Sequence, residues 1–230
     1  MFYVNKKEAR LIVLQRIELC SDFLKKIRKL FGRHFFSNFI TKFFLNSKTI
    51  GKSYYNRMNE EFKIFEKHID HNDKNVLSIG GGMGGLEVIL NNNSEVNFFD
   101  FIERNFVSKK VVYGWSSNNS EAYNNLNLQS EFLVKNGLSK IKFKIFDFDN
   151  DVLPSKKFDT VISLYSLDYH YDFDLYVEYL KKNTHNESKI IFDTVRPDFF
   201  KSIFKEVIIL DETIKRVHSS KRLLCKNFLN

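Results

Sequence analysis

Five of the chain's nine glycines stand within six positions, in the segment 76–85, which reads VLSIGGGMGG. An apolar run precedes these glycines and the run LEVIL follows them, so the pattern predicts a strand, a tight turn and a helix. Glycine lets a backbone turn sharply and approach a ligand closely, and a helix N-terminus offers free N–H groups. The spacing matches Gly-x-Gly-x-x-Gly at Gly80, Gly82 and Gly85, which indicates a nucleotide-type cofactor site.

Acids at the ends of the next two expected strands bear on the identity of that cofactor. Asp100 closes the expected strand 95–100, after the glycine turn. A carboxylate there can accept hydrogen bonds from both ribose hydroxyls, whether the sugar belongs to NAD or to S-adenosylmethionine. The third expected strand leads into Asp147 and Phe148, an acid that can accept from an adenine amino group and a ring that can cover the base.

A tyrosine-rich segment after the fourth expected strand carries the candidate catalytic residues. His170 is the best general base, because an imidazole titrates near neutral pH, and Asp168 can orient it or bind substrate. Tyr165 and Tyr169 can bond acceptor hydroxyls, and Arg196, after the fifth expected strand, can grip a phosphate or carboxylate. Two simpler interpretations stay open: His170 caps the following helix, and Arg196 forms a surface ion pair.

Helices alternate with short apolar strands from residue 75 onward, which predicts an α/β fold. We expect a Rossmann-like, doubly wound, mostly parallel sheet, closed by an antiparallel hairpin of 206–210 and 221–226. The other expected strands are 75–79, 95–100, 141–146, 158–164 and 188–193, and the expected helices are 84–91, 120–136 and 172–182. Residues 104–119 fit no element clearly, although 111–113 can form an extra strand.

The first part of the chain predicts a helical extension over residues 1–72, ahead of a Rossmann-like domain over 73–230. Apolar residues at helical spacing predict a helix over 6–31, which Gly32 ends or bends. Further helices are expected over 34–45 and 53–69, the last with Ser53 as a candidate N-cap.

The chain carries a formal net charge of +8, and much of it falls in residues 23–48, which hold seven Lys or Arg and no acid. Six phenylalanines interleave with these charges. The favoured interpretation is an amphipathic helix whose aromatic side packs on the main domain while its lysines are solvated. Contact with a membrane surface is the main alternative, and nucleic acid is the weaker one.

The remaining composition favours a cytoplasmic protein. No apolar run is long enough for a spanning helix, and the first residues lack the plan of a signal peptide. Cys20 and Cys225 stand far apart without the spacing of metal ligands, which indicates reduced thiols. The histidines are scattered, so we expect no metal site.

Taken together, these motifs make residues 54–226 resemble the class I S-adenosylmethionine-dependent methyltransferases. VLSIGGGMGG corresponds to that family's first motif, and the segment 158–164, FDTVISL, to its fourth strand. The resemblance implies S-adenosylmethionine as cofactor, held by the residues Ser78, Gly80, Gly81, Gly82, Asp100, Asp147, Phe148 and Leu164. The chain departs from the family at Ser78, where many members carry an acid that helps to hold the methionine end.

A looser likeness points to the methyl acceptor. Residues 113–115 (YGW), 121–126 (EAYNNL), 165–171 (YSLDYHY) and 193–197 (DTVRP) are similar to segments of sugar O-methyltransferases from bacterial surface-glycan loci. This likeness implies O-methylation of a sugar or another small hydroxylated acceptor, with the acceptor as the expected partner.

Three other functions stay open. An RNA methyltransferase fits the charge, but the segment after the fourth strand, SLYS, lacks the Asn/Asp-Pro-Pro-Tyr/Phe motif of amino-directed enzymes. A protein that binds the cofactor without catalysis is compatible with Ser78. An NAD-dependent enzyme is disfavoured, because the fourth strand leads into no glycine-rich second half and the terminal hairpin is unlike a dinucleotide domain.

Overall fold

The computed structural model describes residues 1–108, 122–169, 171–211 and 219–229. The predicted strand at 111–113, the segment 113–115 and His170 therefore lie outside the described residues. The α-helices are α1 (Lys6–Gln15), α2 (Asp22–Phe35), α3 (Thr41–Phe43), α4 (Ser47–Phe65), α5 (Gly85–Asn93), α6 (Leu126–Lys135) and α7 (Val177–Asn183). The strands are β1 (Asn75–Ile79), β2 (Phe98–Glu103), β3 (Phe143–Asp147), β4 (Phe158–Ser163), β5 (Thr184–Thr194), β6 (Phe204–Ile209) and β7 (Lys221–Phe228).

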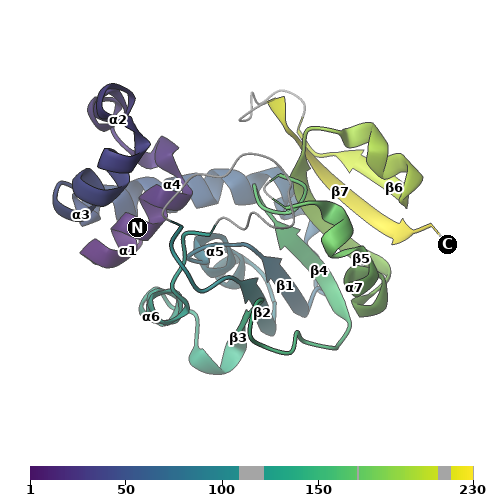
Figure 1. The fold of residues 1–230 in the computed structure, drawn as a ribbon. Helices are drawn as coiled ribbons and strands as arrows, with labels where there is room; N and C mark the ends of the chain where they lie inside the picture. The colour runs from purple at the N-terminus through teal and green to yellow at the C-terminus, as the bar shows by residue number, and fades with distance from the viewer. Residues whose placement is uncertain (109–121, 170, 212–218, 230) are drawn as a thin grey trace.

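The described strands form one sheet in the order β3-β2-β1-β4-β5-β7-β6 (Figure 1). The first five strands in this order are parallel to one another. β7 runs antiparallel to both β5 and β6, which confirms the predicted closing hairpin. The strand order reverses at β1, and in such open sheets ligands bind beyond the carboxyl ends of the strands at this switch point.

Both faces of the sheet are buried, because successive strand residues enter two different cores. Val76 joins the core under α1, α4, α5 and α6, whereas Leu77 joins the core under α7. Phe101 and Ile102 divide in the same way on β2. Helices cover both faces, which confirms the predicted doubly wound α/β architecture.

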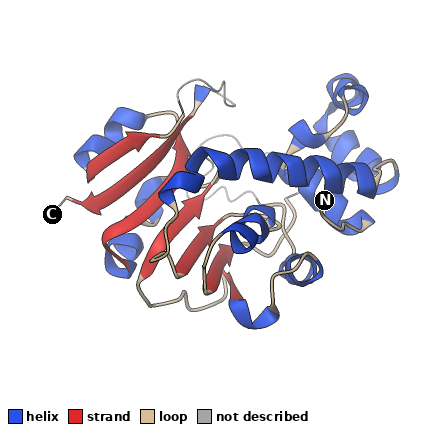
Figure 2. Ribbon diagram, turned by 180° about the vertical axis from the view of Figure 1, so that it is seen from behind, coloured by secondary structure: helices blue, strands red, loops and turns tan. Residues whose placement is uncertain are grey.

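The N-terminal helices pack on the sheet core through α1 and α4, whose buried residues share one cluster with β1 and α5. Figure 2 shows the long helix α4 running from the sheet to the N-terminal helices. Asn46 caps α4 by accepting from the N–H of Thr49, so the helix begins six residues before the predicted cap at Ser53.

The predicted helix over 6–31 is wrong, because two helices replace it. α1 ends at Gln15, and a short 3-10 turn, Ile17–Leu19, leads into α2. Gly32, with φ +82°, kinks α2 near its end, and a π-helical turn, Phe36–Ile40, joins it to α3. This break brings the end of α1 to the mouth of the cavity described below.

Two further boundaries differ from the prediction and matter for the site. β2 spans Phe98–Glu103 and so begins three residues later than the expected strand 95–100. The backbone N–H groups of Asn97 and Phe98 both donate to the carbonyl of Lys74, and this turn precedes the strand. α6 begins only at Leu126, where the side chain of Asn125 accepts from the N–H of Leu128. Within the described ranges, no helix has the length and apolarity needed to cross a bilayer.

Candidate active site

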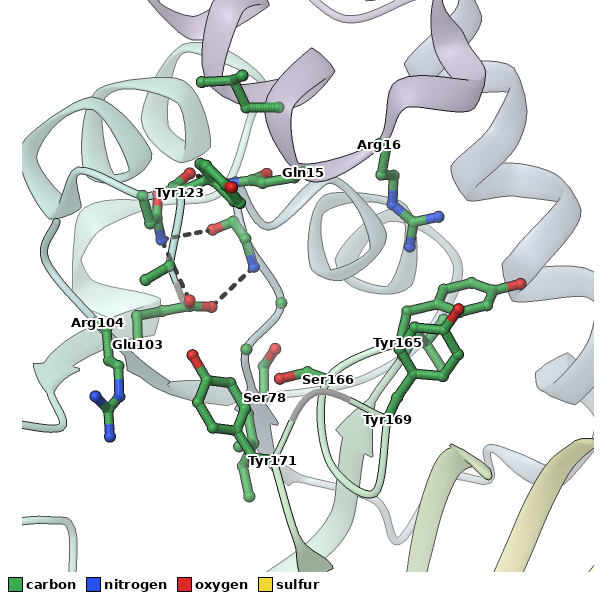
Figure 3. A pocket seen from close by; sticks show the side chains of 18 of the residues that line it. Gln15, Arg16, Ser78, Glu103, Arg104, Tyr123, Tyr165, Ser166, Tyr169 and Tyr171 are labelled. Atoms are coloured by element: carbon green, nitrogen blue, oxygen red, sulfur yellow. Dashed lines mark hydrogen bonds between the residues drawn. The ribbon is translucent and has the colours of Figure 1, made fainter. Parts of the chain in front are cut away.

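A cavity of about 620 Å³ opens at the carboxyl ends of β1, β2 and β4. Its floor is the glycine turn after β1, and one wall is the loop that follows β4. The end of α1 and residues of α2 and the π-helical turn form the opposite side. Figure 3 shows side chains from these segments facing the same space.

The glycine turn leaves its backbone open to the cavity. Gly80 and Gly82 have φ values of +63° and +66°, a region that side-chain-bearing residues rarely adopt. A Cβ atom at Gly80 would lie 2.0 Å from the Oγ of Ser166, and one at Gly82 would lie 2.5 Å from the Oε1 of Gln15. Gly80, Gly81 and Gly82 all line the cavity. The turn therefore offers bare backbone to a ligand.

A buried carboxyl group lies beside this turn. Ser78 donates a hydrogen bond of 2.6 Å from its Oγ to the Oε1 of Glu87, in the first turn of α5. Both residues line the cavity, and burial raises the pKa of Glu87. Its second oxygen, Oε2, is buried and accepts no hydrogen bond from the rest of the described chain. The hydrogen bond from Ser78 thus holds a carboxyl group of the following helix beside the glycine turn.

Glu103 is the acid at the tip of β2. The parallel register pairs Ile79 with Ile102, so Glu103 falls beside the glycine turn. Its Oε1 accepts from the N–H of Gly82 at 2.9 Å, and its Oε2 accepts from the Nδ2 of Asn124 at 3.2 Å (Figure 3). Burial, reinforced by the nearby Glu87, raises the pKa of Glu103 to about 8.

Asp100 does not line the cavity. The expectation that it ends the strand is wrong, because β2 continues to Glu103. Asp100 stands in the middle of β2, buried, with its Oδ2 2.6 Å from the Nζ of Lys156. Burial raises its pKa and the ion pair opposes that shift. The polar position expected at the strand end belongs to Glu103, three residues later.

The two residues after the third strand have separate roles. Asp147 pairs with Glu103 in the register, but its carboxylate accepts from the N–H of Asp149 and the Nδ2 of Asn150 in the following turn. It does not line the cavity. Phe148 does, and the guanidinium of Arg104 lies 4.8 Å from the centre of its ring. The ring is thus the part of this motif that lines the cavity.

Aromatic side chains form the wall that follows β4. Leu164, Tyr165, Tyr169 and Tyr171 line the cavity, and the rings of Tyr165 and Tyr169 meet edge to face at 5.6 Å. Figure 3 shows these two rings together and Tyr171 nearer to Ser78. Burial raises the pKa of Tyr169 to about 12, so its hydroxyl is a neutral hydrogen-bonding group.

Asp168 also lines the cavity, but both oxygens of its carboxylate accept hydrogen bonds from other residues of the chain. The Nε and Nη2 of Arg196 donate to Oδ1 at 3.0 and 2.5 Å, and the Oγ1 of Thr194 donates to Oδ2 at 2.5 Å. Arg196 also contacts Asp172 and does not line the cavity. Asp168 has φ +57°, so these bonds hold the loop in a strained backbone conformation.

A buried ion network supports the tyrosine wall from behind. The guanidinium of Arg222, on β7, has no exposed surface and donates to both oxygens of Asp193, at 3.0 and 2.9 Å. It also donates to Glu61 of α4 at 2.5 Å. The Oδ2 of Asp193 accepts from the backbone N–H of Tyr165 at 3.1 Å. The network thereby ties two strands and α4 to the start of the wall.

Several cavity residues were not predicted from the sequence, namely Gln15, Arg16, Glu87, Glu103 and Asn124. The Nε2 of Gln15 donates to the carbonyl of Tyr123 at 2.7 Å, and the Arg16 guanidinium lies 5.3 Å from the ring centre of Tyr165. The change from apolar to polar residues after Glu103 is the signal that would have found that acid. No cluster of possible metal ligands occurs among the described residues.

Comparison with solved structures agrees with this architecture. A candidate O-methyltransferase from Nostoc punctiforme aligns with a TM-score of 0.52 and 10% identity, over 78% of this chain and 58% of that one. The O-methyltransferase segment of StiE gives a TM-score of 0.48 at 15% identity (74% and 73% covered). Ribosomal protein L11 methylase from Lactobacillus delbrueckii gives 0.45 at 13% (80% and 81% covered).

Searches of family models and of curated proteins returned no match. The chain spans little more than half of the Nostoc protein, and identities this low bear on the fold alone. The chain therefore has a Rossmann-like fold, similar to that of the Nostoc protein.

Proposed function

We propose that this chain transfers a methyl group from S-adenosylmethionine to a hydroxyl oxygen of a small acceptor, with a sugar as the favoured class. The observation that carries the proposal is the cavity itself. It joins a bare glycine turn, a buried acid at the tip of β2 and a wall of tyrosines at one sheet edge. Each part matches a different portion of the two expected ligands.

The residues present fit the cofactor. Glu103 is placed to accept from ribose hydroxyls, and its bonds to Gly82 and Asn124 keep the carboxyl at the turn. The ring of Phe148 offers a flat apolar surface for a base. The unpartnered Oε2 of Glu87 supplies the carboxyl oxygen that an ammonium group requires, in place of the acid missing at Ser78.

The bound cofactor would supply an electrophilic methyl group on a sulfonium. The work left to the protein is to align the acceptor oxygen with that methyl and to receive the hydroxyl proton. Tyr165, Tyr169 and Tyr171 form a wall with apolar rings and polar tips, which suits a hydroxylated acceptor. The tyrosine wall also limits the access of water to the reacting oxygen.

The general base is proposed to be His170. Its neighbours Tyr169 and Tyr171 both line the cavity, and an imidazole is suited to proton transfer near neutral pH. Asp168 is assigned a positioning role instead, because its carboxylate already binds Arg196 and Thr194. We assign Arg196 the same structural task of holding this loop, rather than contact with the acceptor.

Binding and turnover test the proposal separately. Titration calorimetry of the full chain should give micromolar affinity for S-adenosylmethionine and for its demethylated product, and weaker affinity for NAD. A screen with labelled cofactor over nucleotide sugars, glycans and RNA should then transfer label to a hydroxylated small acceptor. Tighter binding of NAD would refute the cofactor, and methylation of RNA alone would refute the acceptor class.

Substitution of His170 tests the base. His170→Ala should retain cofactor binding and lose most turnover on the acceptor that the screen identifies. His185→Ala is the matched control, because that imidazole lies near Asp159 at the opposite end of β4. Full turnover by the His170 variant would exclude it as the base.

A further inference from the structure

The segment from α2 to α3 carries a row of phenylalanine rings that faces solvent. We call Phe31, Phe35, Phe39, Phe43 and Phe44 the aromatic row. Between 41% and 65% of each residue's surface is exposed. Neighbouring rings stand 5.3 to 5.8 Å apart, so they form one continuous apolar strip.

The row is the outer face of these helices, and their inner face is occupied by other residues. Phe36 and Ile40 are buried in the core shared with the sheet. The expectation that the aromatic side packs on the main domain is therefore wrong for every ring of the row. Phe23 and Leu30, 70% and 78% exposed, add further apolar surface to α2. An exposed strip of this kind marks an interaction surface.

Positive charge surrounds the strip. Residues 23–48 contain seven Lys or Arg and no acid. Lys26, Lys29 and Lys42 are exposed on the same elements, and Lys48 is exposed in the first turn of α4. Aromatic rings beside lysines on an amphipathic helix suit the boundary between lipid headgroups and acyl chains, where anionic lipids attract the cations.

We propose that the aromatic row and its flanking lysines dock this protein on an anionic lipid bilayer. A second copy of the chain fits the surface less well, because a two-fold interface would bring two equally basic segments together. Nucleic acid fits less well too, because neighbouring rings already touch each other and leave no gap for a base.

Docking there would set the cavity at the bilayer. Arg28 of α2 and Phe36 of the π-helical turn line the cavity, and Phe31, Phe35 and Phe39 of the aromatic row lie on these same elements. Figures 1 and 2 show α2 and α3 at the end of the molecule away from the C-terminus. An acceptor attached to a lipid would therefore reach the cavity without leaving the membrane, a consequence that rests on the proposed function.

Vesicle flotation tests the docking without any turnover, so its failure is distinguishable from failure of the methyltransferase proposal. The full chain should float with vesicles of phosphatidylcholine that contain phosphatidylglycerol. It should stay behind with phosphatidylcholine alone, and raised salt should weaken binding. Equal binding to both kinds of vesicle, or none to either, would overturn the proposal.

Two variants locate the surface. Phe35→Ser, Phe39→Ser and Phe43→Ser combined should weaken vesicle binding by more than about a hundredfold, from lost apolar burial. Ile141→Ser with Val152→Ser is the matched control, because both residues are exposed elsewhere and should leave binding unchanged. Equal losses of vesicle binding in the triple serine variant and in the control variant would refute the assignment of the aromatic row as the docking surface.

Charge-reversal variants of the flanking lysines test the electrostatic part of the docking, again with a matched control. Lys26→Glu with Lys29→Glu should weaken binding at least about tenfold, whereas Lys67→Glu with Lys205→Glu, exposed on other elements, should have little effect. Sedimentation of the chain without lipid completes the test. A dimer that the triple serine variant dissociates, or salt-sensitive RNA binding in the absence of vesicle binding, would assign the surface to another partner and refute the proposal.

Discussion

Replacing Glu103 by Gln should stabilise the free protein and weaken cofactor binding at the same time. The carboxyl is buried at the tip of β2, and its pKa is raised from 4.5 to about 8. The folded protein therefore holds the proton more tightly than the unfolded chain does. The contribution of this group to stability is full below about pH 4.5, and it falls as the pH rises toward 8.

The size of the gain follows from the same shift. At pH 7.5 the gap above the ordinary pKa of 4.5 is about three units, and one unit corresponds to about 1.4 kcal/mol, which sets a ceiling of about 4 kcal/mol. In Glu103→Gln, the donors of Gly82 and Asn124 must share one acceptor oxygen, at a cost of about 1 to 2 kcal/mol. The net expectation is a gain of about 2 kcal/mol, or a rise in Tm of roughly 4 to 8 °C.

The effect on the cofactor has the opposite sign. A carboxylate can accept from two ribose hydroxyls, and hydrogen bonds to a charged group are worth about 1.5 to 3 kcal/mol each. The amide of Glu103→Gln keeps one acceptor without charge, so Kd for S-adenosylmethionine should rise about 10- to 100-fold. In the parent protein, binding should release a proton below about pH 8, because ribose donors favour the ionised carboxyl.

Thermal melts and titration calorimetry in buffers of different ionisation enthalpy measure both effects. Glu206→Gln is the control, because this acid is exposed on β6 and should change neither stability nor affinity. A variant that loses stability, or one that keeps full cofactor affinity, would refute the role given to Glu103.

The remaining predictions concern the same site and its support. Asp100→Asn should leave cofactor affinity within about twofold, measured by calorimetry, because Asp100 pairs with Lys156 away from the cavity; a loss like that of Glu103→Gln would contradict this placement. Glu87→Gln should weaken S-adenosylmethionine binding about tenfold without lowering Tm, because it removes a carboxyl group that can ionise against an ammonium group but keeps an acceptor for Ser78; unchanged affinity would remove Glu87 from the site. Arg222→Met should lower the free energy of unfolding by about 3 to 5 kcal/mol in urea, because it leaves the buried carboxylate of Asp193 without its cation and removes one of the cations that pair with Glu61; a loss below about 1 kcal/mol would show that the network is dispensable.

The alternation of strands and helices was sufficient to predict the sheet and its glycine turn. The strand 75–79 and the residues Gly80 to Gly82 stand where the pattern placed them. A short apolar run and a glycine-rich turn are local signals, because neighbouring residues alone produce them. The antiparallel hairpin of β6 and β7 was predicted from the two apolar runs 206–210 and 221–226, which are also local signals.

The end of β2 shows where local signals fail. In the run FFDFIE, the first acid interrupts an apolar strand and resembles its end. Asp100 stays inside the strand because Lys156, far along the chain, lies 2.6 Å from its carboxylate. A partner so distant in the sequence does not alter the local pattern of residues. The sequence therefore did not predict that Glu103 is the acid beside the glycine turn.

The predictions for the end of α1, which lines the cavity, and for the aromatic row were wrong for a related reason. The spacing of apolar residues predicts one helix over 6–31, but tertiary packing ends α1 at Gln15 and turns the chain over the cavity. Helical spacing also predicts an apolar face without saying what covers it. In this chain Phe36 faces the core while the rings on either side of it, Phe35 and Phe39, face solvent.

The central claim is that the cavity holds S-adenosylmethionine with Glu103 against its ribose. Calorimetric titration of the full chain and of Glu103→Gln with S-adenosylmethionine and with NAD tests it most directly. The account predicts micromolar binding of S-adenosylmethionine, weakened in the variant, with weaker binding of NAD. Tighter binding of NAD, or equal affinity of both proteins for S-adenosylmethionine, would contradict it.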